Sequence, residues 1–246
     1  AGVLPLLKAF GLDTMRIYNA VLTGKRVCFV GYSHSAKELA ALVLGTVALV
    51  APPIAGVIKR AFPYASLTDL TFLECGGFIA GCTNPIFSGH PEWWDLLCVL
   101  DGDYDNEVGT IPAAGAAANN NPRDSAWLRP GTIGRVLTSE QVRRDKERNG
   151  GRPAVDVGGG ARENVTGGTL TSAGQALLPC DLKFVSHVIA GMESAHVQLG
   201  EEWVSQRFHD YTWDILQRGL DRKALDNGGS KMDVVRDDAA GTAAGS

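Results

Sequence analysis

The sequence predicts an α/β fold: a central sheet flanked by helices, followed by a disordered insert and a C-terminal helical pair. Two observations predict it. In residues 10–101, short apolar runs of strand length follow helical segments, an order typical of α/β domains. In residues 181–220, apolar side chains recur at helical spacing in two segments, which cannot bury their apolar faces alone.

The first helix and the first strand are expected close together. Asp13 or Thr14 can cap a helix that runs to about Leu22, and Gly24 follows as its stop signal. Residues 27–30 then form a short apolar run, which is typical of a strand buried on both faces. This order predicts a helix that leads directly into the sheet.

A second helix and two more strands complete the predicted sheet. Ser33 or Ser35 begins a helix that continues to about Val50, and the Pro52-Pro53 pair ends it. The next segment mixes Pro, Ser, Thr and Asp, which predicts an ordered connection with short helical turns. The remaining buried-strand candidates are residues 77–82 and 96–100.

The second half of the chain divides by composition. Residues 102–180 hold few large apolar side chains to offset the entropy of ordering, so a mostly disordered insert is expected there. Residues 181–220 are the helical segment, with Gly219 as the stop of its second helix. Residues 221–246 are polar and rich in Gly and Ala, and are expected to be a disordered tail.

The bulk composition narrows the function classes. The chain is 45% hydrophobic and 20% charged, which is ordinary for a soluble globular protein. Its net charge of −4 provides no global basic field, so nucleic acid is not an expected partner. The 5 cysteines include no C-x-x-C pair, which favours free buried thiols in a reducing cytosol. The N-terminal residues do not resemble a signal peptide, so a cytoplasmic protein is expected.

The sequence contains neither a nucleotide-binding motif nor metal-ligand spacing. Gly24-Lys25 closes a helix and opens a strand, whereas a phosphate-binding loop follows a strand and opens a helix. The five histidines show neither H-x-x-x-H nor H-E-x-x-H spacing. The sequence therefore predicts no metal and no cofactor.

Gly31-Tyr32-Ser33-His34-Ser35 has the context of a hydrolase nucleophile elbow, G-x-S-x-G, between a strand and a helix. In that interpretation Ser33 is the nucleophile and Asp101 the acid, and the histidine comes from a later segment. The candidate histidines are His187, His196 and His209. The fifth position is Ser35 instead of Gly, and too few residues precede the elbow for the upstream strands. Helix capping by Ser33 and Ser35 is therefore the favoured interpretation.

Several runs resemble a known family. Residues 15–27, MRIYNAVLTGKRV, resemble a helix, a basic pair and the first strand of the central DENN subdomain. The Pro52-Pro53 pair, residues 61–64 and the segment from 70 to 81 resemble stretches that follow in that subdomain. Residues 62–70, 79–87 and 93–98 are most similar to its fungal polarity-axis stabilisation subgroup, which includes an Arf-docking protein. The resemblance implies that residues 10–101 form a central DENN-like domain and that residues 181–220 are a helical segment of the downstream DENN region.

This resemblance implies a function carried by a surface. It implies a Rab-type or Arf-type small GTPase as the partner, bound by an exchange factor or docking module of membrane traffic or cell polarity. No catalytic residue is expected, because an exchange factor works by differential binding. The GTPase-binding candidates are Tyr64, Asp69, Asn84 and Trp93. Each of the four can equally be a turn or packing residue, and Trp93 stands beside a second tryptophan, Trp94.

Three functions remain open from the sequence. The first is exchange or docking, the second is a scaffold that binds a GTPase without releasing nucleotide, and the third is a serine hydrolase that uses Ser33. In the first two the GTPase would bring the protein to a membrane or a polarised cortex as a peripheral component.

Overall fold

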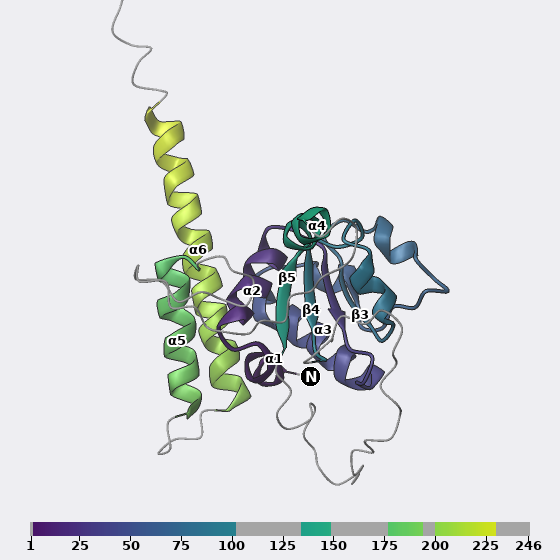
Figure 1. The fold of residues 1–246 in the computed structure, drawn as a ribbon. Helices are drawn as coiled ribbons and strands as arrows, with labels where there is room; N and C mark the ends of the chain where they lie inside the picture. Colours follow the sequence, from purple (N-terminus) through teal and green to yellow (C-terminus); the bar gives the residue numbers. More distant parts are fainter. Residues whose placement is uncertain (1, 102–133, 149–176, 194–199, 230–246) are drawn as a thin grey trace, which may run out of the picture.

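The structure is a computed structural model that describes residues 2–101, 134–148, 177–193 and 200–229 (Figure 1). It confirms the predicted α/β class. The strands are β1 (Val27–Val30), β2 (Ala61–Phe62), β3 (Ile79–Cys82), β4 (Leu96–Val99) and β5 (Arg135–Thr138). They form one sheet in the order β2-β3-β1-β4-β5. β1 to β4 are parallel, and β5 is antiparallel to β4.

Six α-helices and four short 3₁₀ helices are described in these residue ranges. The α-helices are α1 (Val3–Phe10), α2 (Thr14–Leu22), α3 (Ala36–Val50), α4 (Ser139–Arg148), α5 (Pro179–Glu193) and α6 (Glu201–Gly229). The 3₁₀ helices are η1 (Gly11–Asp13), η2 (Val57–Arg60), η3 (Thr71–Glu74) and η4 (Pro85–Gly89). The three predicted strands correspond to β1, β3 and β4, and β1 pairs with each of the other two over four residues.

The two faces of the sheet are covered differently. Alternate strand residues such as Val27 and Phe29 face a layer of helices that includes α1, α2 and α3. Cys28 and Val30 face the other way, into a second cluster under η3 and η4. That cluster is rich in aromatic rings, and Phe72 packs edge-on against Phe78 at 5.0 Å between ring centroids. The sheet is therefore buried on both faces, as its short apolar strands predicted.

Local chemistry explains where two of the helices begin and end. Thr23 is the C-cap of α2, and Gly24 follows with φ of 69°, a left-handed conformation that glycine adopts without steric cost. At the start of α3, Ser35 forms a capping box with Glu38. Ser35, rather than Ser33, therefore caps α3.

The C-terminal helices pack on the helix layer instead of standing apart. The hydroxyls of Tyr18 in α2 and Thr212 in α6 share a buried hydrogen bond of 2.8 Å. Asn19 of α2 donates to the buried carboxylate of Asp181 in α5 at 2.7 Å. The Glu201 side chain accepts hydrogen bonds from the backbone N–H groups of Val3 and Leu4 and so satisfies donors at the start of α1.

The structure corrects three expectations about order and element boundaries. Residues 135–148 of the expected disordered insert form β5 and α4, because β4 supplies backbone partners that a composition argument cannot reveal. Helix α6 runs through Gly219 to Gly229 and so extends into the expected tail, since a single helical glycine costs only about 1 kcal/mol. The expected connection at 61–73 contains the short strand β2, which pairs with β3. Residues 179–180 of the expected insert also begin α5. Residues 102–133, 149–176 and 230–246 lie outside the described residues.

Candidate functional site

The carboxyl ends of the parallel strands gather several loops at one edge of the sheet. The turn at residues 31–35 follows β1, Tyr64 follows β2, Asn84 follows β3 and Asp101 follows β4. The chain leaves β1 toward β2 and β3 on one side, and leaves β4 toward β5 on the other. Ligands of open α/β sheets bind at such a switch point, outside the carboxyl ends of the strands. This edge is therefore the first place to look for a site.

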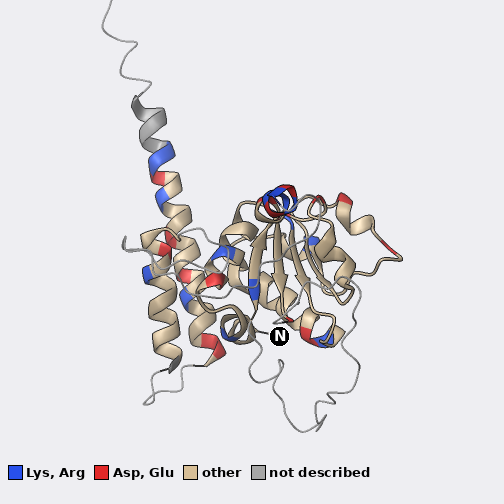
Figure 2. Cartoon of the chain, in the orientation of Figure 1, with Lys and Arg blue, Asp and Glu red and all other residues tan. Residues whose placement is uncertain are grey.

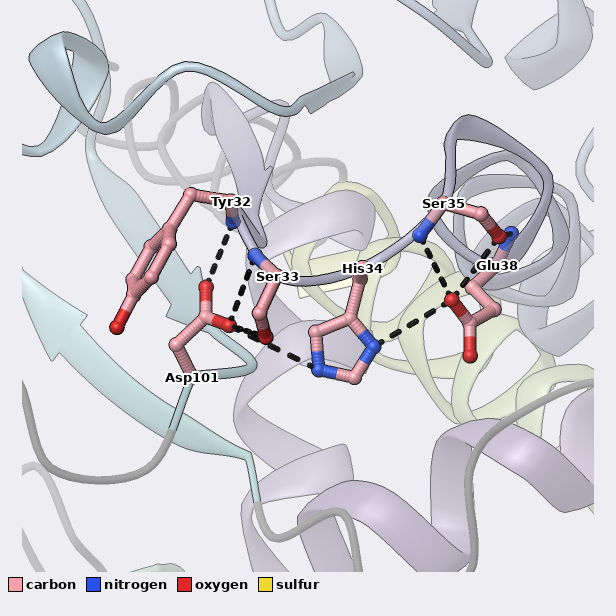
Figure 3. A network of polar contacts seen from close by, with 6 residues as sticks. All are labelled: Tyr32, Ser33, His34, Ser35, Glu38 and Asp101. Atoms are coloured by element: carbon pink, nitrogen blue, oxygen red, sulfur yellow. Dashed lines mark hydrogen bonds and ion pairs between the residues drawn. The ribbon is translucent and has the colours of Figure 1, made fainter. Parts of the chain in front are cut away.

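A polar network joins the β1–α3 turn to the end of β4 (Figure 3). The backbone N–H of Tyr32 donates to the Asp101 carboxylate at 2.7 Å, and that of Ser33 donates to it at 3.2 Å. The Ser33 hydroxyl donates to the same carboxylate. Asp101 therefore occupies the backbone donors that an anionic ligand would use at this turn.

His34 lies in the middle of this network and is buried. Its Nδ1 is 3.6 Å from the Glu38 carboxylate, and its Nε2 is 4.0 Å from that of Asp101. Gly31 lets the ring approach closely, since a Cβ at that position would lie 3.1 Å from the His34 Cβ. The histidine thus links the two carboxylates at the mouth of the switch point (Figure 3).

This geometry differs from a serine hydrolase. In a catalytic triad the histidine lies between the serine and the acid. Here Ser33 donates directly to the acid, Asp101, while Ser35 caps α3. His187 and His209 lie on α5 and α6, the helices that pack on the far side of the helix layer, and His196 is outside the described residues. The structure therefore gives the hydrolase alternative no assembled triad.

Two of the four predicted binding residues lie together at the carboxyl edge. The Tyr64 side chain is exposed, and its hydroxyl is 3.3 Å from that of Thr83 at the end of β3. Asn84 caps η4, where its side-chain oxygen accepts from the backbone N–H of Ile86 at 3.0 Å. Tyr64 therefore presents an accessible ring beside a loop whose shape is set by Asn84.

The other two predicted residues have local roles. Asp69 accepts hydrogen bonds from the Thr71 backbone at 3.1 Å and from its hydroxyl at 2.6 Å, and these bonds lower the Asp69 pKa. Trp93 stacks on His90 at 4.0 Å between ring centroids and lies three residues before β4 begins. Trp93 is thus near the amino end of the strands, so the structure does not bring all four together.

A cleft at the opposite edge was not predicted from the sequence. It measures about 430 Å³ and lies between α2, the start of β4, the β5–α4 junction and the start of α5. Its polar lining includes Arg16, Lys25 and the buried Asp181, which also accepts from the Tyr211 hydroxyl at 2.6 Å. Burial and the bond to Asp181 raise the pKa of Tyr211 well above its ordinary value. The lining comes from segments far apart in the chain, so no local motif signals it.

The described residues contain neither a metal-ligand cluster nor a membrane-spanning helix. Their His, Cys, Asp and Glu side chains form no group of three or more that could hold a metal ion. Cys28, Cys82 and Cys98 are buried free thiols, and burial raises the pKa of Cys98. None of the described helices combines the length and hydrophobicity needed to cross a bilayer.

Comparison with known proteins links the N-terminal part of the chain to cell polarity. Residues 1–104 match the family model described as stabilization of polarity axis. An AFI1-like protein of Schizosaccharomyces pombe is 36% identical over 89 residues, which are 35% of this chain and 14% of that relative. The chain thus matches a small part of the relative's length. No solved structure shows a significant match.

These findings correct the family assignment. The matching family model is the polarity-axis one, the similar relative is AFI1-like, and neither supports a DENN domain, so that assignment is wrong. The physical reason is that a helix, a basic pair and a buried strand, as in residues 15–27, recur in α/β domains generally. What the comparisons support is a relation of residues 1–104 to the stabilisation of a polarity axis.

Proposed function

We propose that this chain is a docking module that helps to stabilise a polarity axis by holding a small GTPase of the Rab or Arf type. The observation that carries the docking role is the accessible loop surface at the carboxyl edge, where Tyr64 and Ile86 are exposed. Exposed aromatic and aliphatic side chains beside polar loops are typical of protein interfaces. The small-GTPase identity of the partner is the more specific part of the proposal.

Docking is preferred to nucleotide exchange. The expectation of exchange came from the DENN resemblance, which the polarity-axis match has replaced. Docking requires only that the GTPase bind, and it makes no demand on the relative affinities of the nucleotide-bound and nucleotide-free forms. In this role the GTPase would bring the chain to the polarised membrane as a peripheral component.

The test is binding of the chain to a panel of purified Rab and Arf proteins in their GDP, GTP-analogue and nucleotide-free forms. We expect at least one to bind, and Tyr64→Ala to weaken that binding by about tenfold or more, as for an aromatic interface residue. Trp213→Ala on α6, also exposed at 59%, is the matched control and should leave the affinity unchanged. Failure of every GTPase to bind would remove the GTPase from the proposal.

Release of a fluorescent GDP, measured with the same proteins, separates docking from exchange. Docking predicts that the chain leaves the release rate unchanged at concentrations that saturate binding. A saturable acceleration of release would instead make the chain an exchange factor. Ester hydrolysis that is abolished by Ser33→Ala would return the hydrolase alternative, which the Ser33–Asp101 contact argues against.

A further inference from the structure

Two large apolar side chains are exposed on neighbouring loops of the sheet face opposite α3. Tyr64 is 53% exposed on the loop after β2, and Ile86 is 46% exposed on η4. The loops are held together, because Tyr64 contacts Thr83 and the rings of Phe72 and Phe87 pack beneath them at 6.1 Å. We call this region the η3–η4 surface. Its exposed members are Tyr64, Thr68, Asp69, Thr71, Glu74, Asn84, Pro85 and Ile86.

The charged side chains of residues 61–101 have a single sign. Residues 61–101 contain no lysine or arginine, and their charged side chains are Asp69, Glu74, Glu92, Asp95 and Asp101. Asp95 pairs with Arg26, Glu92 contacts His90, and Asp101 is held by the β1–α3 turn. The two remaining acids, Asp69 and Glu74, are the exposed charges of the η3–η4 surface. Figure 2 shows acidic but no basic residues on the loops farthest from α5 and α6.

Residues 61–101, which contain no lysine or arginine, contact the basic helix α4 within the chain. In α4, Arg143 donates to the backbone oxygen of Pro91 at 3.4 Å, and Val142 packs against the aromatic cluster under η3 and η4. Lys146 of α4 also contributes, after the His90 hydrogen bond, to the lowered pKa of Glu92. Residues 61–101 thus bind Val142 of α4 together with the cations Arg143 and Lys146 near Pro91 and Glu92. The η3–η4 surface lies outside this contact.

We infer that the η3–η4 surface binds a protein segment that presents an apolar contact flanked by lysine or arginine. Tyr64 and Ile86 supply the apolar contact, and Asp69 and Glu74 attract and orient the cations. The charge sign disfavours nucleic acid and anionic membranes as occupants, because both are negatively charged. This inference rests on the proposed docking function but not on the partner being a GTPase.

The test uses two designed amphipathic peptides with the same apolar face, one with lysine and arginine and the other with glutamate on its polar face. Each is titrated into the ¹⁵N-labelled chain. The basic peptide should shift the backbone amide signals of Tyr64, Asp69, Asn84 and Ile86. The acidic peptide should bind at least tenfold more weakly.

Variants separate this surface from general attraction to an acidic protein. Asp69→Lys with Glu74→Lys should weaken binding of the basic peptide by about tenfold, and Tyr64→Ser with Ile86→Ser by a similar factor. Asp210→Lys with Asp214→Lys on α6 is the control and should change the affinity less than twofold, since it makes the same charge change elsewhere. Unperturbed amide signals away from the substituted loops verify that each variant is folded.

Two outcomes would overturn the inference. One is equal binding of both peptides, and the other is binding that maps elsewhere or is insensitive to the Asp69 and Glu74 reversals. The proposed function fails separately. If no GTPase binds but the basic peptide does, the partner class is wrong and the surface stands. If a GTPase binds but the reversals leave its affinity unchanged, the docking function stands and the surface is wrong.

Discussion

At the scale of single residues, one ion pair joins the beginnings of two adjacent strands. The Arg26 backbone N–H donates to the Asp95 carboxylate at 2.9 Å, and its guanidinium donates at 3.0 and 3.2 Å. The backbone N–H of Asp95 donates in turn to the Arg26 carbonyl at 2.9 Å. Arg26 precedes β1 and Asp95 precedes β4, so the pair helps to set the register between these strands.

This pair makes stability depend on pH. Partial burial raises the pKa of Asp95, but the hydrogen bonds from Arg26 and its charge outweigh burial and lower the pKa below 3.8. A carboxylate with a lowered pKa stabilises the fold above its unfolded pKa, and the contribution is lost as the pH falls below about 4. Asp95→Asn should cost about 1–2 kcal/mol at pH 7, a modest value because solvent screens the pair, whose side chains are 30% and 33% exposed.

Urea unfolding at pH 7 and at pH 3 measures the effect, and the difference between Asp95→Asn and the parent chain should shrink at pH 3. Asp214→Asn, which breaks the exposed Arg218 pair on α6, is the control and should cost less than about 0.5 kcal/mol at either pH. A difference at Asp95 that stays constant with pH would contradict the electrostatic explanation.

At the scale of elements, two helical glycines have opposite surroundings. Gly45 lies in α3 where α1 crosses it, and a Cβ there would collide with the backbone oxygen of Gly2. Gly219 lies in α6, and a Cβ there would meet open space. The same residue type is thus required by packing in one helix and is only a weak point in the other.

Alanine at the two positions should have effects of opposite sign. Gly45→Ala pushes α1 away from α3 and should destabilise the chain by about 1–3 kcal/mol. Gly219→Ala improves helix propensity and should stabilise α6 locally by about 0.5–1 kcal/mol. Urea unfolding measures the first, and slower amide hydrogen exchange in α6 measures the second. Destabilisation by both substitutions would show that Gly219 has a contact that its helix geometry does not predict.

At the scale of the whole molecule, the C-terminal helices share their core with the sheet. Phe208 of α6 is fully buried, 5.8 Å from the ring of Tyr18 in α2 and 5.1 Å from that of Phe184 in α5. These rings belong to the cluster that also contains Val27 and Phe29 of β1. The helices at 179–193 and 201–229 are therefore part of one core with the α/β region, although residues 149–178 separate them from α4 in sequence.

Phe208→Ala should destabilise the entire fold. Removing a fully buried ring costs about 3–5 kcal/mol, and because the core is shared, the loss should lower the midpoint for the sheet and the helices together. Urea curves followed by circular dichroism and by tryptophan fluorescence should coincide and shift by the same amount. Trp213→Ala, which removes an exposed ring from the same helix, should cost less than about 1 kcal/mol. Two separate transitions would show that the helices form an independent unit.

How far each feature could be predicted depends on whether its cause is local. The buried strands β1, β3 and β4 are visible as apolar runs, and Ser35 with Glu38 is a local capping signal. Strand β2 has only two residues, and β5 lies in a part of the chain with few large apolar side chains, so neither has a clear local signal. Both form through backbone pairing with a neighbouring strand, β3 or β4. The sequence predicts both Tyr64 and Trp93 as aromatic interface candidates in loops. Only the structure distinguishes them, because Tyr64 is exposed and Trp93 stacks on His90.

The sequence alone determined the α/β class, because strand and helix periodicities are written in local patterns of apolar residues. It also determined the single charge sign of residues 61–101. Only the tertiary structure decided which loops share the carboxyl edge, that Asp101 closes the β1–α3 turn, and that Tyr64 and Ile86 lie exposed on neighbouring loops. The reason is that strand order and long-range pairing depend on packing between segments distant in the chain, which no local pattern records.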